Sequence, residues 1–278
     1  MRTRIGAQRI KPSRTSKGVY TVPAVKKAFM ILELMASHNC GYTITEVAKL
    51  FNLPVSTTNV LLHSLRECGY VQRSEKGVFS LTMKLFTEGN KVVNEVELHQ
   101  LALPELERLA ALTDLTVSVA IPDKYELIYL CVFQGRGDIL VQARVGQRRY
   151  FHQAATGKAM LAFFPEERVK EYAEVTSLPA ATPQTVSSYR LLIRELERVR
   201  VQGYAIDNEE SGHGLWGIAA PIFDRNGRVA GALGLAGTVL HLQRNMDGLN
   251  QEVKRSAQEV SRGLGYKSEV VTKLGVRS

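Results

Sequence analysis

The segment LPVSTTNVLLHSLRECGY, residues 53–70, constrains the N-terminal part of this chain more than any other stretch does. At about 100° per residue, its leucines and Cys68 share one side of a helix, and polar side chains take the opposite side. Pro54 is compatible only with the first turn, and Gly69 ends the helix. The segment therefore predicts a short amphipathic helix, whose polar face is either solvated or used for binding.

The neighbours of this helix decide between the two interpretations. Apolar residues recur at helical spacing over 22–36, and residues 43–51 predict a second short helix with Thr45 as its N-cap. Asn52 and Leu53 form a tight turn, and SEKG with Gly77 predicts a hairpin after the third helix. Three helices followed by a hairpin predict a winged helix-turn-helix at 19–83.

In this fold the third helix enters the major groove of DNA, so its polar face offers donors and acceptors to base edges. Hydroxyls near the helix start reach phosphates, and two basic side chains of the wing hold flanking phosphates. The DNA-binding candidates are therefore Thr45, Ser56, Thr57, Thr58, Asn59, His63, Arg66, Arg73 and Lys76.

The charge distribution favours the same interpretation. The chain has a net charge of +9, and residues 1–18 hold six Lys or Arg and no acid. A basic segment of this kind is typical of a disordered arm that meets phosphates or enters a minor groove. The alternative is a solubility tail or a leftover leader.

Composition excludes several other classes. Hydrophobic residues make up 45% of the 278 residues, enough for real cores. The three cysteines are far apart and odd in number, which fits neither a disulfide framework nor a zinc site. No apolar stretch approaches about 18 residues, and the N-terminus lacks a signal-peptide core. We expect a cytoplasmic protein with no membrane segment, metal or cofactor, in which Cys68 and Cys131 are packed.

The rest of the chain predicts a linker and a second domain. Residues 84–112 read as a linker helix region, with Pro104 starting a new helix. Strands are expected at 115–122, 126–133, 138–145, 214–223 and 228–237, and helices at 156–164, 166–174, 188–203 and 242–266. Asn226 and Gly227 predict a hairpin turn. Segregated strands and helices indicate an α+β domain at 113–266, before a tail at 267–278.

Several stretches together resemble the IclR-type transcriptional regulators: AFMILELMA, LPVSTTNVLLHSLRECGYV, FSLTMKLFTEG, HQAATGKAMLA and GYAIDNEESGHGLWGIAAPIFDRNGRVAGALGLAG. The resemblance covers roughly 22–266. It implies a GAF/PAS-like effector-binding domain, dimers that often pair into tetramers, and pseudo-palindromic operators in double-stranded DNA. It also implies control of a catabolic operon by a small organic acid or aromatic effector, with repression slightly favoured.

The resemblance also implies ligand-binding positions. Backbone N–H groups of Ala154, Ala155 and Thr156 would meet a carboxylate, and Asp207 would accept a hydroxyl or another donor. Where the family usually has a cysteine and two serines, this chain has Gly217, Gly234 and Ala236. These departures predict a bulkier and less polar effector. The alternative is that the glycines only allow close backbone approach.

Two other functions stay open from the sequence. One is an enzyme that uses the C-terminal domain, and the other is an architectural DNA-binding module. Glu209 and Glu210 are unconvincing as an acid/base pair, because adjacent carboxylates on a strand point to opposite faces. His213 alone does not make a metal site. Because no catalytic set stands out, we expect no enzyme activity.

Overall fold

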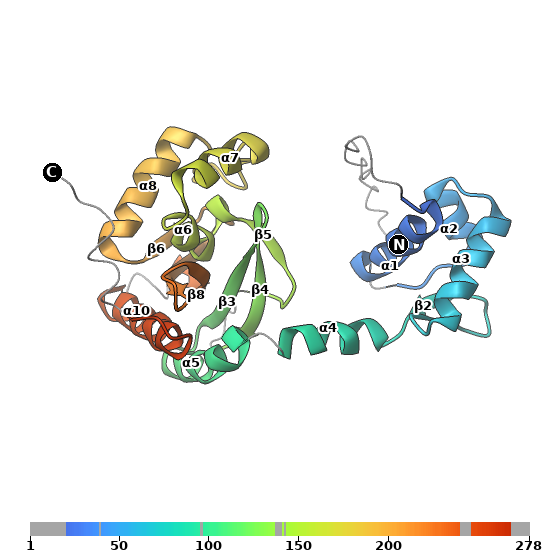
Figure 1. Ribbon diagram of the computed structural model, residues 1–278, viewed down its shortest axis with the longest axis horizontal. Coiled ribbons are helices and arrows are strands. Elements are labelled where there is room, and N and C mark those ends of the chain that lie inside the picture. Colours follow the sequence, from blue (N-terminus) through green and yellow to red (C-terminus); the bar gives the residue numbers. More distant parts are fainter. Residues whose placement is uncertain are drawn as a thin grey trace. The chain divides into compact units, whose positions relative to one another are not determined.

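The computed structural model describes residues 21–38, 40–94, 97–136, 141, 143–239 and 246–267. The chain divides into two compact units, 1–91 and 92–278 (Figure 1). The predicted basic arm at 1–18 and all but the first residue of the predicted tail at 267–278 lie outside the described residues.

The N-terminal unit is the predicted winged helix-turn-helix. Its elements are α1 (Pro23–His38), α2 (Ile44–Phe51), α3 (Val55–Glu67), β1 (Val71–Arg73) and β2 (Phe79–Leu81). The two strands pair antiparallel, and Gly77 adopts a φ of +75° in the turn between them. Fully buried side chains from α1, α2, α3 and β2 meet in one core: Ile31, Val47, Leu62 and Phe79.

The start of α2 differs from the prediction. Thr43 is the N-cap, because its hydroxyl accepts a hydrogen bond from Glu46 N and its own N–H donates to Glu46 Oε2 at 2.7 Å. This reciprocal capping box places the N-cap two residues before Thr45, so the prediction of Thr45 as the cap was wrong. Asn52, at a φ of +52°, forms the predicted tight turn. Cys68 is exposed, contrary to prediction: it is the C-cap of α3 and lies beyond Leu65, the last buried residue of the helix.

Helices α4 (Lys84–Asn94) and α5 (Glu97–Thr113) occupy the predicted linker region. The prediction that Pro104 starts a helix was wrong, because this proline lies inside α5. Proline removes one backbone hydrogen bond from a helix. Leu98 before it and Leu106 and Leu109 after it are buried in one core, and this burial keeps the helix continuous across the proline.

The C-terminal unit is built on a six-stranded antiparallel sheet with the order β5-β4-β3-β8-β7-β6. The strands are β3 (Thr116–Asp123), β4 (Glu126–Phe133), β5 (Arg148–Tyr150), β6 (Ala205–Asn208), β7 (Leu215–Phe223) and β8 (Val229–Thr238). The predicted hairpin of β7 and β8 is confirmed. The strand predicted at 138–145 is not found among the described residues of this range. Residues 141 and 143–145 are not in a strand, and β5 begins at 148.

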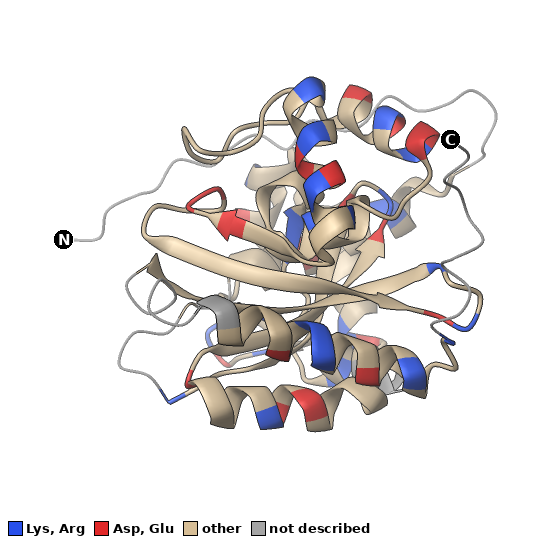
Figure 2. Ribbon diagram, turned by 90° about the vertical axis from the view of Figure 1, so that its left-hand side faces the viewer, with Lys and Arg blue, Asp and Glu red and all other residues tan. Residues whose placement is uncertain are grey.

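Helices cover both faces of this sheet, as Figure 2 shows. Helices α5 and α10 (Met246–Gly263) pack on one face, and α6 (Ala155–Leu161), α7 (Glu166–Thr176) and α8 (Tyr189–Gln202) pack on the other. A short 3-10 turn, Phe151–Gln153, precedes α6. The predicted α+β fold is therefore confirmed. No helix among the described residues is both long and apolar enough to cross a lipid bilayer.

Candidate nucleic-acid interface and ligand cavity

The outward face of α3 carries most of the predicted DNA-binding side chains. Ser56, Asn59 and Arg66 are exposed, and Thr57 and His63 are half-buried. Leucines of the opposite face anchor the helix in the core, so the polar side chains are held on a fixed helical surface. The arrangement offers hydroxyl, amide and guanidinium groups from one helix, which is the set that reads base edges and phosphates.

Thr58 does not belong to this surface. Its side chain is fully buried, and its hydroxyl donates to the carbonyl of Pro54 at 3.1 Å. A threonine in a helix can satisfy its hydroxyl on the carbonyl four residues back and then pack its methyl group inward. The structure therefore places Thr58 in the core, contrary to its prediction as a DNA contact.

The other predicted contacts lie outside α3. Arg73 and Lys76 are exposed in the wing, and the guanidinium of Arg73 lies 5.7 Å from the centroid of the Phe79 ring. Thr45 is exposed on α2. Positive charge in the wing and polar groups on α3 thus belong to the same compact unit.

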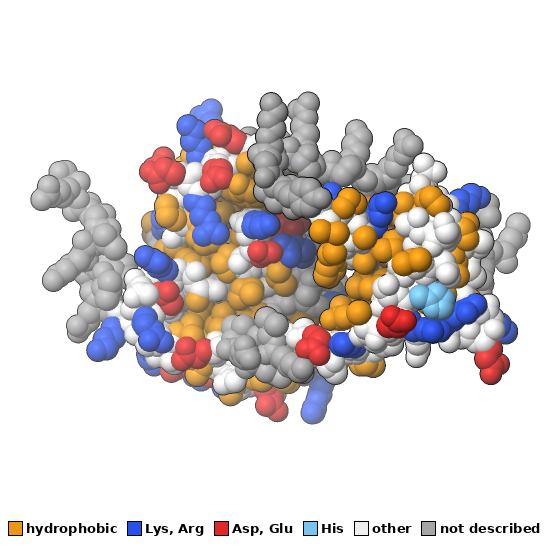
Figure 3. Space-filling view, turned by 45° about the vertical axis from the view of Figure 1, so that its right-hand side comes forward, with side chains coloured by type: hydrophobic (Ala, Val, Ile, Leu, Met, Phe, Trp, Pro, Cys, Tyr) orange, Lys and Arg blue, Asp and Glu red, His pale blue; other side chains and the backbone are white. Residues whose placement is uncertain are grey.

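This unit also leaves apolar side chains at its surface, where Figure 3 shows them gathered. Val25 and Phe29 of α1 are 53% and 60% exposed, and Phe86 of α4 is 62% exposed. Isolated exposed apolar residues need no explanation, but Val25 and Phe29 lie one helical turn apart on α1, which is typical of a surface that contacts another group.

In the C-terminal unit, all seven predicted ligand-binding residues line one small cavity, which has a volume of about 50 Å³ and opens to solvent. The strand register explains how three of them meet. Asp207 of β6 lies opposite Gly217 of β7, which lies opposite Ala236 of β8. Directly opposed residues share a sheet face, and Gly234, two residues from Ala236, faces the same side.

The other three residues, Ala154, Ala155 and Thr156, come from the start of α6. Their backbone is brought against the preceding turn by Gly157, where a Cβ atom would lie 2.0 Å from the carbonyl oxygen of Phe151. The Thr156 hydroxyl is buried and makes no hydrogen bond within the described part of the structure. A buried hydroxyl without a partner is costly, so a bound polar group would satisfy it.

The glycines do not all enlarge the cavity. At Gly234 a Cβ atom would lie 2.8 Å from the Thr156 methyl group, so that space is already filled. At Gly217 the nearest atom to an added Cβ would be the Leu235 carbonyl oxygen, at 3.2 Å. Both glycines thus serve close packing, as the alternative interpretation holds, and the fit is tighter at Gly234 than at Gly217.

Asp207 is buried, and its Oδ1 accepts hydrogen bonds from the backbone N–H groups of Glu210 and Ser211 at 2.8 and 3.1 Å. Burial raises the pKa of Asp207 above its ordinary value, and the hydrogen bonds from Ser211 act against that rise. One carboxylate oxygen therefore organises the loop after β6, in addition to the role in ligand binding that the resemblance implies.

The sequence analysis missed several residues of the cavity, and two of them carry charge or a phenol. Arg149 of β5 and Tyr129 of β4 line it. Burial raises the pKa of Tyr129, and the charge of Arg149 opposes that rise. The Thr156 hydroxyl lies near the phenol but outside hydrogen-bond geometry. Arg149 forms no ion pair with any described residue, so a cation is available to an anionic ligand. The sequence offered only a basic pair, Arg148 and Arg149, without a sign of which one faces inward.

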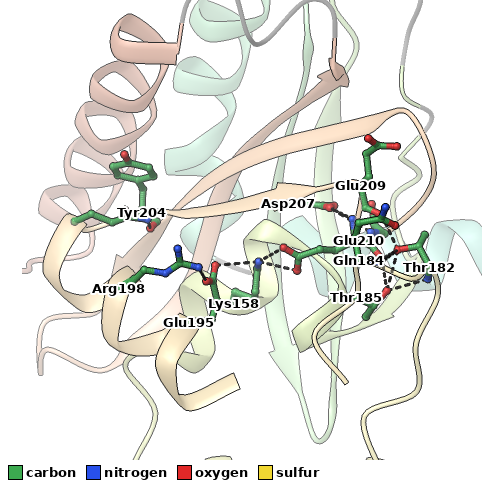
Figure 4. A network of polar contacts seen from close by, with 12 residues as sticks. Lys158, Thr182, Gln184, Thr185, Glu195, Arg198, Tyr204, Asp207, Glu209 and Glu210 are labelled. Carbon is green, nitrogen blue, oxygen red and sulfur yellow. Dashed lines mark hydrogen bonds and ion pairs between the residues drawn. The ribbon is translucent and has the colours of Figure 1, made fainter. Parts of the chain in front are cut away.

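A buried ionic network lies beside the cavity (Figure 4). The Lys158 side chain is fully buried, and its Nζ lies 2.6 Å from Glu210 Oε1 and 3.2 Å from Glu195 Oε1. Glu195 also contacts Arg198. Burial raises the pKa of Glu210 to about 6, against the attraction of Lys158.

Glu209 and Glu210 lie in a loop after β6 and not on a strand, so the reason given for discounting them was wrong. The structure still separates them, since Glu209 Oε2 accepts a hydrogen bond from Gly214 N and Glu210 pairs with Lys158. Among the described residues, no group of three His, Cys, Asp or Glu side chains could hold a metal ion.

Comparison with known proteins assigns both units to a family. The pattern described as "IclR helix-turn-helix domain" matches residues 24–75, and that described as "Bacterial transcriptional regulator IclR C-terminal" matches residues 90–262. The regulator XynR of Escherichia coli is 30% identical over 247 residues, which cover 88% of this chain and 98% of XynR. The regulator KdgR of Dickeya chrysanthemi is 32% identical over 248 residues, covering 88% of this chain and 81% of KdgR.

A solved structure agrees with the sequence comparisons. The IclR protein of Thermotoga maritima has a TM-score of 0.77 and 32% identity, over 88% of this chain and 99% of that one. The relatives are transcriptional regulators and not enzymes, as the sequence predicted. The chain belongs to the IclR family of DNA-binding transcriptional regulators.

Proposed function

We propose that this protein binds a pseudo-palindromic operator through α3 and the wing, and that a small organic anion in the cavity changes its affinity for that DNA. The regulated genes form a neighbouring catabolic operon, repression is the favoured mode, and the protein works in the cytoplasm with its DNA. The observation that supports the ligand is one cavity lined by Arg149 and the Thr156 hydroxyl, neither of which has an ion-pair or hydrogen-bond partner among the described residues.

The DNA arm of this proposal is tested by titrating the full chain with its own upstream region at several salt concentrations. Phosphate-dominated binding should weaken steeply as salt rises. Asn59→Ala should reduce the preference for that fragment over random DNA, whereas Lys76→Ala should weaken both kinds of DNA alike. If the upstream region competes no better than random DNA, the operator proposal fails.

The ligand-binding part of the proposal is tested with two neighbouring arginines, one that lines the cavity and one that serves as its control. Arg149 lines the cavity, whereas Arg148, next to it on β5, pairs with Asp123 and Glu126 on the other side of the strand. A panel of aliphatic, sugar-derived and aromatic carboxylates is screened by the shift in melting temperature of the full chain. Arg149→Met should abolish the shift that a binding compound gives, and Arg148→Met should keep it. Equal loss in both variants would contradict the proposed ligand site.

We also propose that the protein is a homodimer or a pair of dimers, since one recognition helix contacts too few bases for useful specificity. The exposed Val25, Phe29 and Phe86 support a second copy as the cover of this surface. Light scattering should give twice or four times the chain mass. Phe29→Glu should reduce the assembly or its DNA affinity if the surface is used, and an unchanged assembly with unchanged DNA affinity would contradict it.

The size of the effector is a separate proposal. The resemblance leads us to expect polar side chains at Gly217 and Ala236, and their absence favours a less polar effector that is bulkier than a two- or three-carbon acid. Tight binding of glyoxylate or pyruvate would contradict this.

A further inference from the structure

The loop between β6 and β7, residues 209–214, forms part of the rim of the cavity. Ser211 in this loop and Leu215 directly after it line the cavity, and Asp207 lies just before it. The loop contains strained backbone, since Glu209 has a φ of +58°. Its conformation therefore depends on contacts outside the loop.

A first contact is ionic. Both carboxylate oxygens of Glu210 lie within 2.7 Å of Lys158 Nζ, which comes from α6. Lys158 is two residues after Thr156, so the ion pair joins the helix that supplies one wall of the cavity to the loop that supplies another. The backbone N–H of Glu210 donates to Asp207 Oδ1, so the same residue also holds the cavity carboxylate.

A second contact comes from the segment 177–188 between α7 and α8. The hydroxyl of Thr182 donates to the Glu209 carbonyl at 2.7 Å, and the hydroxyl of Thr185 donates to the Glu210 carbonyl at 2.6 Å. Figure 4 shows both threonines against the loop. The same segment is held at Pro179, whose carbonyl lies 3.0 Å from His152 Nε2 and 2.7 Å from Gln153 Nε2, next to the start of α6.

None of Lys158, Thr182, Thr185 and Glu210 lines the cavity, yet each contacts the loop or lies in it. We propose that these four residues form a latch that positions Asp207 and Ser211 in the cavity wall, and that effector affinity depends on the latch although it does not touch the effector. The dependence on effector binding rests on the proposed function, whereas the positioning of the loop does not.

The charges make the latch testable by double substitution. Lys158→Met leaves Glu210 as a buried anion, and the charged groups that face it are then Glu195 and Asp207. Removing one partner of a buried pair is far more disruptive than removing both. The variant Lys158→Met/Glu210→Gln should therefore recover a closed loop, because the uncompensated charge is gone and Glu195 keeps its contact with Arg198.

Hydrogen–deuterium exchange of the full chain without effector tests the positioning directly. In peptides covering 208–215, Lys158→Met and Thr185→Val should exchange at least about tenfold faster than wild type, while peptides of β8 stay unchanged. The Thr176→Val variant is the control, because its hydroxyl donates to the Tyr172 carbonyl at 2.7 Å and accepts only a long bond of 3.4 Å from Leu178 N, and neither partner lies in the loop 209–214.

Two further readouts separate a charged latch from general loosening. The ratio of exchange in Lys158→Met to exchange in wild type should fall as the pH is lowered from 8 to 5, because protonation of Glu210 removes the unpaired charge. The double variant should return to within about threefold of wild type. The latch is overturned if Lys158→Met leaves the loop protected, or if Thr176→Val loosens it as much as Thr185→Val does.

The dependence of effector binding on the latch is tested by calorimetric titration with sodium benzoate and sodium gluconate, an aromatic and a sugar-derived carboxylate. A probe that binds wild type should bind Lys158→Met and Thr185→Val at least about tenfold more weakly and Thr176→Val equally well. Equal binding by all variants would overturn the link to affinity. If neither probe binds wild type, the proposed effector class is at fault, and the exchange experiment still decides whether the latch positions the loop.

Discussion

The Glu210→Gln substitution should stabilise the C-terminal unit at neutral pH, although it removes a buried ion pair. Glu210 is 8% exposed, and burial raises its pKa from an ordinary 4.5 to about 6 despite the contact with Lys158. The raised pKa means that the folded state favours the neutral carboxyl, relative to the charged one, more than the unfolded chain does. Glutamine has nearly the shape of that neutral carboxyl, and Lys158 keeps its contact with Glu195 in the variant.

The size of the effect follows from linkage. The rise in pKa from 4.5 to about 6 corresponds to about 2 kcal/mol. For a raised pKa, the contribution of the group to stability is fully present below pH 4.5 and is lost as the pH rises through about 6. Glu210→Gln should therefore exceed wild type by up to about 2 kcal/mol at pH 7.5, and the two should converge toward pH 4.5.

Urea unfolding followed by the fluorescence of Trp216 measures this difference. Trp216 is the chain's single tryptophan and is 4% exposed in the C-terminal unit, so its signal reports that unit. Glu259→Gln is the control, since Glu259 pairs with Arg262 at the surface and its loss should cost less than about 1 kcal/mol. If Glu210→Gln is less stable than wild type at pH 7.5, the ion pair outweighs the cost of burial and the reasoning is refuted.

Three other predictions follow from side-chain placement. Asn59→Ala should lower operator affinity about tenfold in anisotropy titrations, without loss of stability. Thr58→Val should instead cost about 1 kcal/mol of stability in the N-terminal unit. A reversed pattern would contradict the assignment of these residues to the two faces of α3. Gly234→Ala should lower the stability of the C-terminal unit by about 1–3 kcal/mol in calorimetry, because its Cβ would lie 2.8 Å from Thr156; an unchanged stability would show that the contact relaxes freely. Cys131 is buried, and burial raises its pKa to about 11. At pH 8 an aromatic disulfide reagent should therefore label only the two exposed cysteines of the folded chain, and all three after denaturation. Rapid labelling of Cys131 in the folded chain would contradict its burial.

The local sequence pattern predicts those elements of this protein that are stabilised by residues close to one another in the sequence. Leu62 and Leu65 are buried as helical periodicity predicted, because a helix must pack its apolar side. The same periodicity misplaced Thr58, since a threonine that satisfies its hydroxyl on the Pro54 carbonyl behaves as an apolar residue. It also misjudged Pro104, because the burial of flanking leucines outweighs the local preference of proline for a helix start.

Predicting the residues of the cavity required two kinds of information. The predicted residues came from the family resemblance, and the register of β6, β7 and β8 then brought three of them into one row. Arg149 and Lys158 could not be predicted in this way. Whether a basic side chain is buried depends on partners far along the chain, and Glu210 is 52 residues from Lys158.

The position of Lys158 shows why a helix motif alone cannot reveal its own function. In the sequence it is one basic residue inside TGKAMLA, and a charged residue in a short apolar helix usually reaches solvent. Here α6 is buried along its whole length, so the ammonium group must find carboxylates inside the protein. Those carboxylates come from α8 and from the loop that borders the cavity. Because a buried charge cannot lose its partners cheaply, any ligand that moves this loop must also rearrange the ion pair, and this couples the contents of the cavity to the packing of α6 and α8.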